Sequence, residues 1–132
     1  MAENGELFDY VKVGGSLSEP VIKNYIKQLL FAVSSIHKEE VCHRDLKLQN
    51  LVLDSDFNLQ VIDFGLACDL SGSDGSGFCH NSERVGTLSH MAPETLMNYD
   101  DQPILADLFA IGVIIFCMYT GRQPFVEASH TD

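Results

Sequence analysis

One stretch of this sequence constrains the fold more than any other feature. Residues 43–50 read His-Arg-Asp-Leu-Lys-Leu-Gln-Asn, and the triplet Asp63-Phe64-Gly65 follows after a short interval. That interval, residues 51–62, holds two short apolar runs on either side of the turn-forming sequence Asp-Ser-Asp-Phe-Asn, which is the pattern of a β-hairpin. Because a hairpin returns its two ends to one place, we expect the polar residues of both flanking segments to share one pocket.

The four polar residues expected in this pocket suit phosphoryl transfer. Asp45 can orient an attacking hydroxyl and accept its proton. Asn50 and Asp63 offer hard oxygen ligands, which suit a Mg²⁺ ion that keeps other positions for water and substrate phosphates. Lys47 carries a point positive charge that can meet the oxygens of a transferring phosphoryl group.

The pair of motifs His-Arg-Asp-x-x-x-x-Asn and Asp-Phe-Gly resembles the eukaryotic protein kinases, and it is far more specific than any single short motif. Lys47, two places after Asp45, is the form similar to serine/threonine kinases rather than tyrosine kinases. The resemblance implies ATP and Mg²⁺ as cofactors, a protein hydroxyl as substrate, and Asp45 and Lys47 as catalytic residues. It also implies that Asn50 and Asp63 hold Mg²⁺ and that Val52 forms the floor of the adenine site.

The resemblance covers residues 1–125 and implies one partial kinase domain over residues 1–132. Its parts are a catalytic loop at 43–50, an activation segment at 63–94 that begins with Asp-Phe-Gly at 63–65, and a central helix at about 103–120. A chain of 132 residues is too short for two lobes. The expected fold class is therefore mainly α with a small β-hairpin: a partial large (C-terminal) lobe, with the small lobe absent.

Two helices are predicted before the catalytic loop. Residues 1–15 carry apolar side chains at helical spacing, with Asn4 as the N-cap of a short helix. Ser18-Glu19-Pro20 opens a second helix with one long apolar face, which we expect to pack in the core beneath the catalytic loop. That face comprises Ile22, Ile26, Leu29, Val33 and Ile36.

Glu6 and the residues around position 43 each allow two interpretations. By resemblance, Glu6 lies near the nucleotide ribose or a basic substrate residue; alternatively, it is an exposed acid favoured by the helix dipole. His37, Cys42 and His43 could suggest a metal, but they lack the spacing of known metal sites. His43 is instead expected to be structural, and by resemblance its ring packs on Phe64.

The activation segment carries the expected regulatory residues. A buried or half-buried Arg needs an anion as a partner. In kinases with Arg before the catalytic Asp, this anion is often a phosphate on the activation segment. By resemblance, Arg44 therefore permits control by phosphorylation of that segment. Residues 66–85 are polar and Gly-rich, which is typical of a mobile loop. The usual phosphosite position holds Glu83, which either partly substitutes for a phosphate or lies beside a modified Ser82. Further candidate phosphoacceptors are Ser71, Ser73 and Ser76.

Residues 86–94 resemble the kinase segment that ends in Ala-Pro-Glu. By resemblance, Thr87 is expected to form hydrogen bonds near Asp45 and Lys47, and Glu94 pairs with a distant downstream Arg. His90 departs from the Tyr that kinases usually carry at this position. That replacement bears on the packing of the substrate platform.

The last predicted helix raises the question of a membrane span. Residues 108–120 carry no charge, but this run is shorter than the roughly 20 residues that a bilayer requires, and Asp107 directly precedes it. We therefore expect a buried central helix and no membrane span. By resemblance, the Asp107 carboxylate holds the backbone of the catalytic loop.

The composition excludes several classes of function. The net charge is −11, with eight basic residues and no basic run, which argues against nucleic-acid binding. The four cysteines, at 42, 68, 79 and 117, indicate neither a zinc site nor a disulfide framework. A reducing setting fits best, and the first ten residues lack a signal peptide. We expect the cytoplasm, or the nucleus, as the location.

Two functions from different classes remain. The first is part of a serine/threonine kinase, similar to the calcium/calmodulin-dependent and AMP-activated kinases, that transfers the γ-phosphoryl of ATP to protein substrates. The second is a catalytically inactive, kinase-like binding or scaffold module. Because the Gly-rich loop and strand Lys are missing, we expect no appreciable activity from the isolated chain, whose partners would include the missing small lobe or the remainder of the kinase chain.

Overall fold

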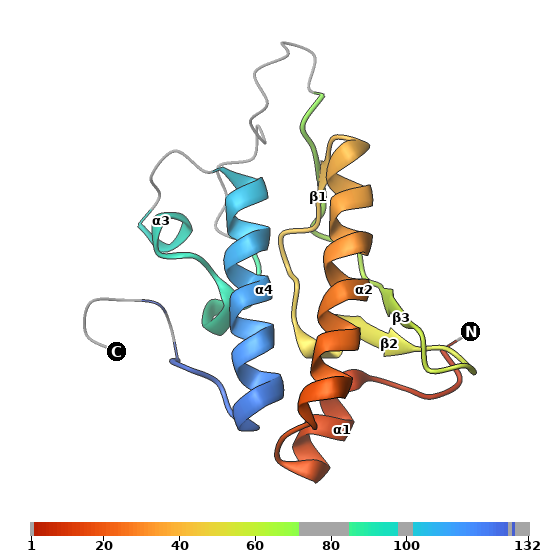
Figure 1. Cartoon of the computed structure of the whole chain (residues 1–132). Coiled ribbons are helices and arrows are strands. Elements are labelled where there is room, and N and C mark those ends of the chain that lie inside the picture. Colours follow the sequence, from red (N-terminus) through yellow and green to blue (C-terminus); the bar gives the residue numbers. More distant parts are fainter. Residues whose placement is uncertain (1, 72–84, 98–101, 127, 129–132) are drawn as a thin grey trace.

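The computed structural model describes residues 2–71, 85–97, 102–126 and 128. Two long helices, α2 and α4, lie side by side and run in opposite directions, and the remaining elements gather around them (Figure 1). The helices are α1 (Leu7–Gly14), α2 (Glu19–Lys38), α3 (Pro93–Leu96) and α4 (Pro103–Thr120). The strands are β1 (Val41–Cys42), β2 (Leu51–Leu53), β3 (Leu59–Val61) and β4 (Cys68–Asp69), and two short 3-10 turns cover Leu48–Asn50 and Leu88–His90.

The predicted hairpin is confirmed. Strands β2 and β3 pair antiparallel in a register that joins Leu51 to Val61 and Leu53 to Leu59. The turn between them is fixed by Asp54, whose carboxylate accepts hydrogen bonds from the backbone N–H groups of residues 56 and 58 at 2.9 and 2.8 Å. The hairpin therefore returns the chain to the catalytic loop, as the sequence pattern predicts.

The first helix begins later than the sequence suggests. Glu6, not Asn4, occupies the N-cap of α1, so the prediction for Asn4 is wrong. The Asn4 side chain instead donates a hydrogen bond to the carbonyl of Asp54 at 2.6 Å, and the backbone on either side pairs with Leu53. Asn4 thus bonds to a carbonyl of the hairpin turn, 50 residues away in sequence. The local sequence around Asn4 does not reveal this partner.

Helices α2 and α4 form most of the core. The apolar face of α2 is buried as predicted at Ile22, Leu29 and Val33, and Tyr25 joins it. Helix α4 has a mean hydropathy of 2.0 and is long and apolar enough to cross a membrane by length and composition. Eight of its residues are nevertheless buried within the protein, as expected of a central core helix: Pro103, Asp107, Ala110, Ile111, Val113, Ile114, Cys117 and Met118.

Two features were not predicted. Strands β1 and β4 form a second two-stranded sheet, which pairs Cys42 with Cys68. Cys68 is disulfide-bonded, though not to Cys42, whereas the cysteine spacing indicated no disulfide framework. Strands of two residues show no periodicity, so the sheet leaves no sequence signal, and cysteine spacing alone does not identify a disulfide partner.

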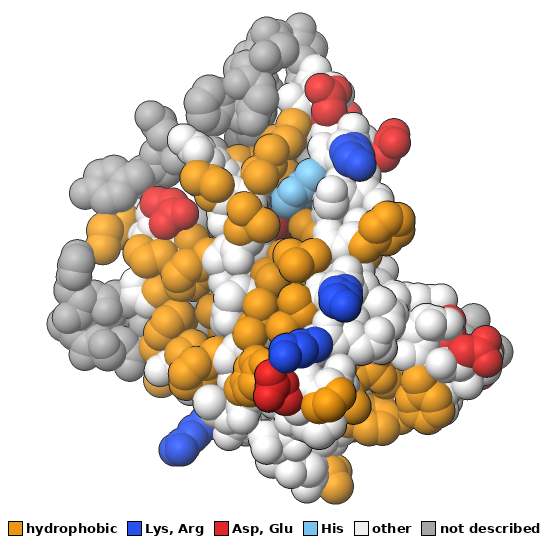
Figure 2. Space-filling model, in the orientation of Figure 1, with side chains coloured by type: hydrophobic (Ala, Val, Ile, Leu, Met, Phe, Trp, Pro, Cys, Tyr) orange, Lys and Arg blue, Asp and Glu red, His pale blue; other side chains and the backbone are white. Residues whose placement is uncertain are grey.

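Apolar side chains cover much of one face of the molecule. Figure 2 shows hydrophobic atoms gathered over α4 and the adjoining face of α2. A cavity of about 480 Å³ lies between the two helices. The exposed apolar residues of these helices include Leu30, Phe31, Ile104, Leu105, Leu108, Phe116 and Tyr119. Contiguous exposed apolar patches of this kind mark surfaces that pack against other protein.

Candidate functional site

The catalytic loop is held by a single buried carboxylate. Asp107, 1% exposed, accepts hydrogen bonds from the backbone N–H groups of His43 and Arg44, each at 2.9 Å. Its Oδ2 also lies 2.8 Å from Nε2 of His37 at the end of α2. Arg44 has a φ of 65°, a left-handed conformation that costs a non-glycine residue free energy. We infer that the two bonds to Asp107 stabilise this turn.

The ring of His43 joins the catalytic loop to the exit of the hairpin. It is fully buried, its Nε2 lies 2.9 Å from the carbonyl oxygen of Ile62, and its centroid lies 4.9 Å from that of Phe64. The backbone N–H of Ile62 in turn donates to the carbonyl of Asn50 at 2.9 Å. These bonds place Asp63 next to the end of the catalytic loop.

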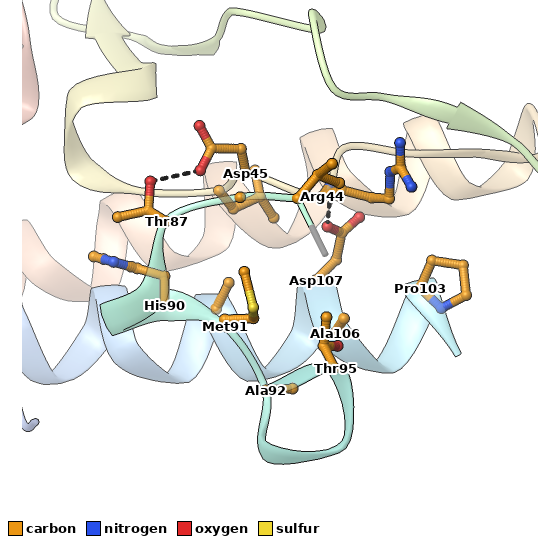
Figure 3. Close-up of a pocket in the computed structure, with 14 residues that line it drawn as sticks. Arg44, Asp45, Thr87, His90, Met91, Ala92, Thr95, Pro103, Ala106 and Asp107 are labelled. Atoms are coloured by element: carbon orange, nitrogen blue, oxygen red, sulfur yellow. Dashed lines mark hydrogen bonds between the residues drawn. The ribbon is translucent and has the colours of Figure 1, made fainter. Parts of the chain in front are cut away.

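Asp45 lies at the centre of a compact polar cluster. Its Oδ1 accepts a hydrogen bond from the Thr87 hydroxyl at 2.7 Å (Figure 3). Its Oδ2 forms an ion pair with the Lys47 ammonium at 2.5 Å. Lys47 also donates to the Thr87 hydroxyl at 3.0 Å. The Asn50 amide donates to the backbone carbonyl of Asp45 at 2.8 Å. The structure therefore brings four residues expected at the site into contact with one another: Asp45, Lys47, Asn50 and Thr87.

This cluster keeps the Asp45 carboxylate ionised. Burial alone would raise the pKa of Asp45, which is 8% exposed. The hydrogen bonds from Lys47 and Thr87, together with the charge of Lys47, outweigh burial and lower that pKa below its ordinary value. At neutral pH the group is thus a hydrogen-bond acceptor that can receive a bond from a further hydroxyl, in addition to those from Lys47 and Thr87.

Asn50 and Asp63 fit a magnesium site by the chemistry of their donor atoms. The amide nitrogen of Asn50 is engaged with Asp45, which leaves the amide oxygen as its ligand atom. Asp63 is exposed and has a φ of 64°. Within the described residues, its carboxylate accepts a hydrogen bond only from the N–H of Gly65, at 3.3 Å. One neutral and one charged oxygen donor suit Mg²⁺.

The two residues predicted to contact the nucleotide lie beside each other. Glu6 and Val52 form an isolated antiparallel bridge, so the start of α1 is joined to the middle of β2. Val52 is buried, whereas Glu6 is partly exposed and its side chain makes no capping bond to α1.

Arg44 directs its side chain away from Asp45 (Figure 3). Its Nε donates to the carbonyl of Leu66 at 2.7 Å, and its buried Nη1 atom has no hydrogen-bond partner among the described residues. The phosphosite candidates Ser82 and Glu83 lie outside the described residues, as do Ser73 and Ser76. Ser71 is exposed, and its hydroxyl bonds to Asp69.

Residues 85–97 pack closely against the catalytic loop. A Cβ atom added to Gly86, whose φ is 114°, would lie 2.6 Å from the carbonyl oxygen of Arg44. Beside this contact is a cavity of about 30 Å³, lined by Asp45, Thr87 and His90 among others (Figure 3). Glu94 lies in the first turn of α3 and makes no ion pair within the part of the chain that the structure describes.

His90 is buried in this segment. Its Nδ1 lies 3.1 Å from the Ser89 hydroxyl, and its buried Nε2 has no partner among the described residues. Burial lowers the pKa of His90 to about 4; the nearby charge of Asp45 opposes the shift and that of Lys47 adds to it. The ring is therefore neutral at pH 7.

Sequence reasoning missed one cluster near the site. Donor atoms of His37, Cys42 and Asp107 lie within 4.8 Å of one another. The sequence analysis weighed His37 and Cys42 as metal ligands with His43, and could not see that Asp107 completes the group. Both Asp107 oxygens already accept backbone hydrogen bonds, so we interpret the cluster as the anchor of the catalytic loop.

Comparison with known proteins agrees with this geometry. The family model described as "Protein kinase domain" matches residues 1–132. The chain is 39% identical to CBL-interacting protein kinase 30 of Oryza sativa subsp. japonica over 97% of its length and 26% of the relative. It is 36% identical to CBL-interacting serine/threonine-protein kinase 16 of Arabidopsis thaliana (93% of this chain, 27% of the relative). It is 38% identical to testis-specific serine/threonine-protein kinase 2 of Mus musculus (94% and 35%). The chain thus spans about a quarter to a third of these relatives.

Proposed function

Because this chain belongs to the protein kinase domain family, in its serine/threonine branch, we propose that it supplies the catalytic face of a large lobe in a kinase that phosphorylates protein hydroxyls. The catalytic loop is residues 43–50, the Asp-Phe-Gly motif is residues 63–65, the activation segment is residues 63–94, and the central helix is α4. The small lobe lies outside residues 1–132.

One observation carries this proposal: the ionised Asp45 carboxylate shares its two oxygens with Lys47 and Thr87. A substrate hydroxyl that donates to this carboxylate would be oriented for attack on the γ-phosphorus. Its proton would pass to Asp45 as the new phosphorus–oxygen bond forms and the bond to the leaving nucleoside diphosphate breaks. The Lys47 ammonium would then be free to meet the oxygens of the transferring group. Thr87 fixes the carboxylate in the required orientation.

Four residues would hold the metal and the nucleotide. Asn50 and Asp63 would hold Mg²⁺, Val52 would contact the adenine, and Glu6 would lie near the ribose. When bound, the magnesium–ATP complex supplies the phosphoryl group and neutralises its charge. The contact between Asn50 and Asp45 couples the metal ligand to the base.

Regulation would act through Arg44. Its buried Nη1 atom lacks a partner in the described part of the chain, which supports a phosphate or carboxylate from the activation segment as its anion. Ser82 and Glu83 are the candidates. The names of the plant relatives also make a CBL protein a candidate partner of the whole protein, which we place in the cytoplasm or nucleus.

A second function, a non-catalytic binding or scaffold module, is favoured by one observation. Exposed apolar side chains cover α4 and the facing side of α2, as on a surface that docks against other protein. A measurement of phosphoryl transfer distinguishes this function from the first, because a scaffold does not need an ionised Asp45.

A chimera tests the proposal. Residues 1–125 would replace the matching segment of the rice relative that is 39% identical, and transfer from labelled ATP to a generic substrate would be measured. We expect transfer that Asp45→Asn reduces by more than 100-fold and Thr87→Val by several-fold, with Lys27→Gln on the exposed face of α2 as the control. The isolated chain should show no appreciable transfer. A folded chimera without activity, or one insensitive to Asp45→Asn, would contradict the proposal.

A further inference from the structure

A second pocket lies beside the polar cluster, between α1 and the end of α4. It has a volume of about 270 Å³. Apolar side chains from both helices and from the catalytic loop form its walls, at Phe8, Val11, Leu48 and Cys117. Polar residues complete its lining at Lys12, Gln49, His90, Arg122 and Gln123, with Gly121 at the helix end. We call this space the cationic pocket.

The charge of the cationic pocket is opposite to that of the chain. The net charge of the protein is −11, yet no residue that lines this pocket is acidic, and Lys12 and Arg122 are both exposed at it. Within the described residues, neither side chain forms an ion pair. The Lys12 ammonium lies 5.8 Å from the centroid of the Phe8 ring, over the apolar wall. Two exposed cations that form no ion pair among the described residues, beside an apolar wall, favour the binding of an anion here.

His90 connects the cationic pocket to the catalytic residues. Its ring lines both this pocket and the small cavity that contains Asp45 and Thr87. Its buried Nε2 lacks a partner among the described residues. Leu48 and Gln49 follow Lys47 directly in the catalytic loop. A peptide whose hydroxyl reaches Asp45 would therefore place a neighbouring residue at the cationic pocket.

We propose that the cationic pocket binds an acidic side chain of the protein substrate and gives this kinase a preference for acidic over basic sequences. The substrate's carboxylate pairs with Lys12 and Arg122, and its aliphatic carbons contact Phe8 and Leu48. The assignment of the bound peptide as a substrate rests on the proposed kinase function; the binding of the peptide does not.

Peptide binding to the whole chain tests the proposal without nucleotide. Fluorescein-labelled peptides with one central Ser would carry Glu, Gln or Lys at each of the four flanking positions in turn, and binding would be followed by anisotropy at 50 mM salt. At one or more positions we expect Glu to bind roughly five- to tenfold more tightly than Lys, since each partly exposed ion pair contributes modestly. This preference should shrink at 1 M salt, where exposed charges are screened.

Charge reversal identifies the residues responsible. Lys12→Glu combined with Arg122→Glu should abolish or reverse the preference, whereas Lys27→Glu, a matched change at an exposed position on α2, should leave it intact. Equal binding of Glu and Lys peptides, or an equal effect of the control, would overturn the proposal. Phosphoryl transfer by the chimera is a separate readout: an active chimera without acidic preference refutes only the pocket, and acidic binding with an inactive chimera refutes only the function.

Discussion

Acidification should destabilise this protein through His90. In an unfolded chain the imidazole binds a proton near pH 6.5, whereas burial lowers the pKa of His90 in the folded protein to about 4. Between these values the unfolded state binds more protons, so the contribution is fully present above pH 6.5 and is lost as the pH falls towards 4. A gap of about 2.5 pH units corresponds to at most about 3–4 kcal/mol of unfolding free energy, at about 1.4 kcal/mol per unit.

The pH window separates this contribution from that of Asp45. Because the pKa of Asp45 is lowered, its contribution is present above the unfolded pKa of about 3.8 and is lost only below it. Urea unfolding at pH 4.5 to 7.5 should therefore show a slope that His90→Gln removes. The ring protons of His90, assigned by comparison with that variant, should titrate near pH 4 in nuclear magnetic resonance spectra. A midpoint near 6.5, or an unchanged slope in the variant, would refute the reasoning.

Three further predictions concern contacts that hold the fold. Gly86→Ala would place a Cβ 2.6 Å from the Arg44 carbonyl oxygen, and we expect a loss of about 2–4 kcal/mol in urea unfolding. Gly121→Ala would place its Cβ 1.6 Å from the carbonyl oxygen of Gly15, so its thermal midpoint should fall by more than that of any exposed substitution; Gly112→Ala, where nothing lies within 4 Å, is the matched control. Asp107→Asn sets an amide donor against backbone donors and should cost about 2–4 kcal/mol, with faster hydrogen exchange at the N–H groups of residues 43 and 44 as the direct measure.

The sequence predicted best where the physical signal is local. The hairpin was foreseen because apolar runs flank a set of turn-forming residues, and the core face of α2 because Ile22, Leu29 and Val33 repeat at helical spacing. Asn4 shows the limit of the same reasoning. Its side chain suits a helix cap, but the carbonyl of Asp54 offers a partner that only the folded chain brings within reach.

Residues that act through distant partners were found only by the resemblance or not at all. Asp107 bonds to a loop more than 60 residues earlier, and nothing in the periodicity of α4 predicts this. Two further features likewise depend on how the elements pack. Gly86 lies close to the Arg44 carbonyl, and Lys12 and Arg122 line one pocket. The spacing of residues in a sequence predicts contacts within about one helical turn or one hairpin. It does not predict the cationic pocket, which joins segments more than 100 residues apart.

The contacts around Asp45 imply that catalytic geometry and catalytic activity are separable in this chain. Three groups hold the catalytic loop, and all of them belong to this chain: Thr87, Lys47 and Asp107. The loop can therefore keep its conformation as long as α4 stays packed on α2. Phosphoryl transfer, by contrast, depends on charges and hydrogen bonds placed on every side of the phosphates. The cluster around Asp45 can therefore keep its geometry whether or not those further groups are present.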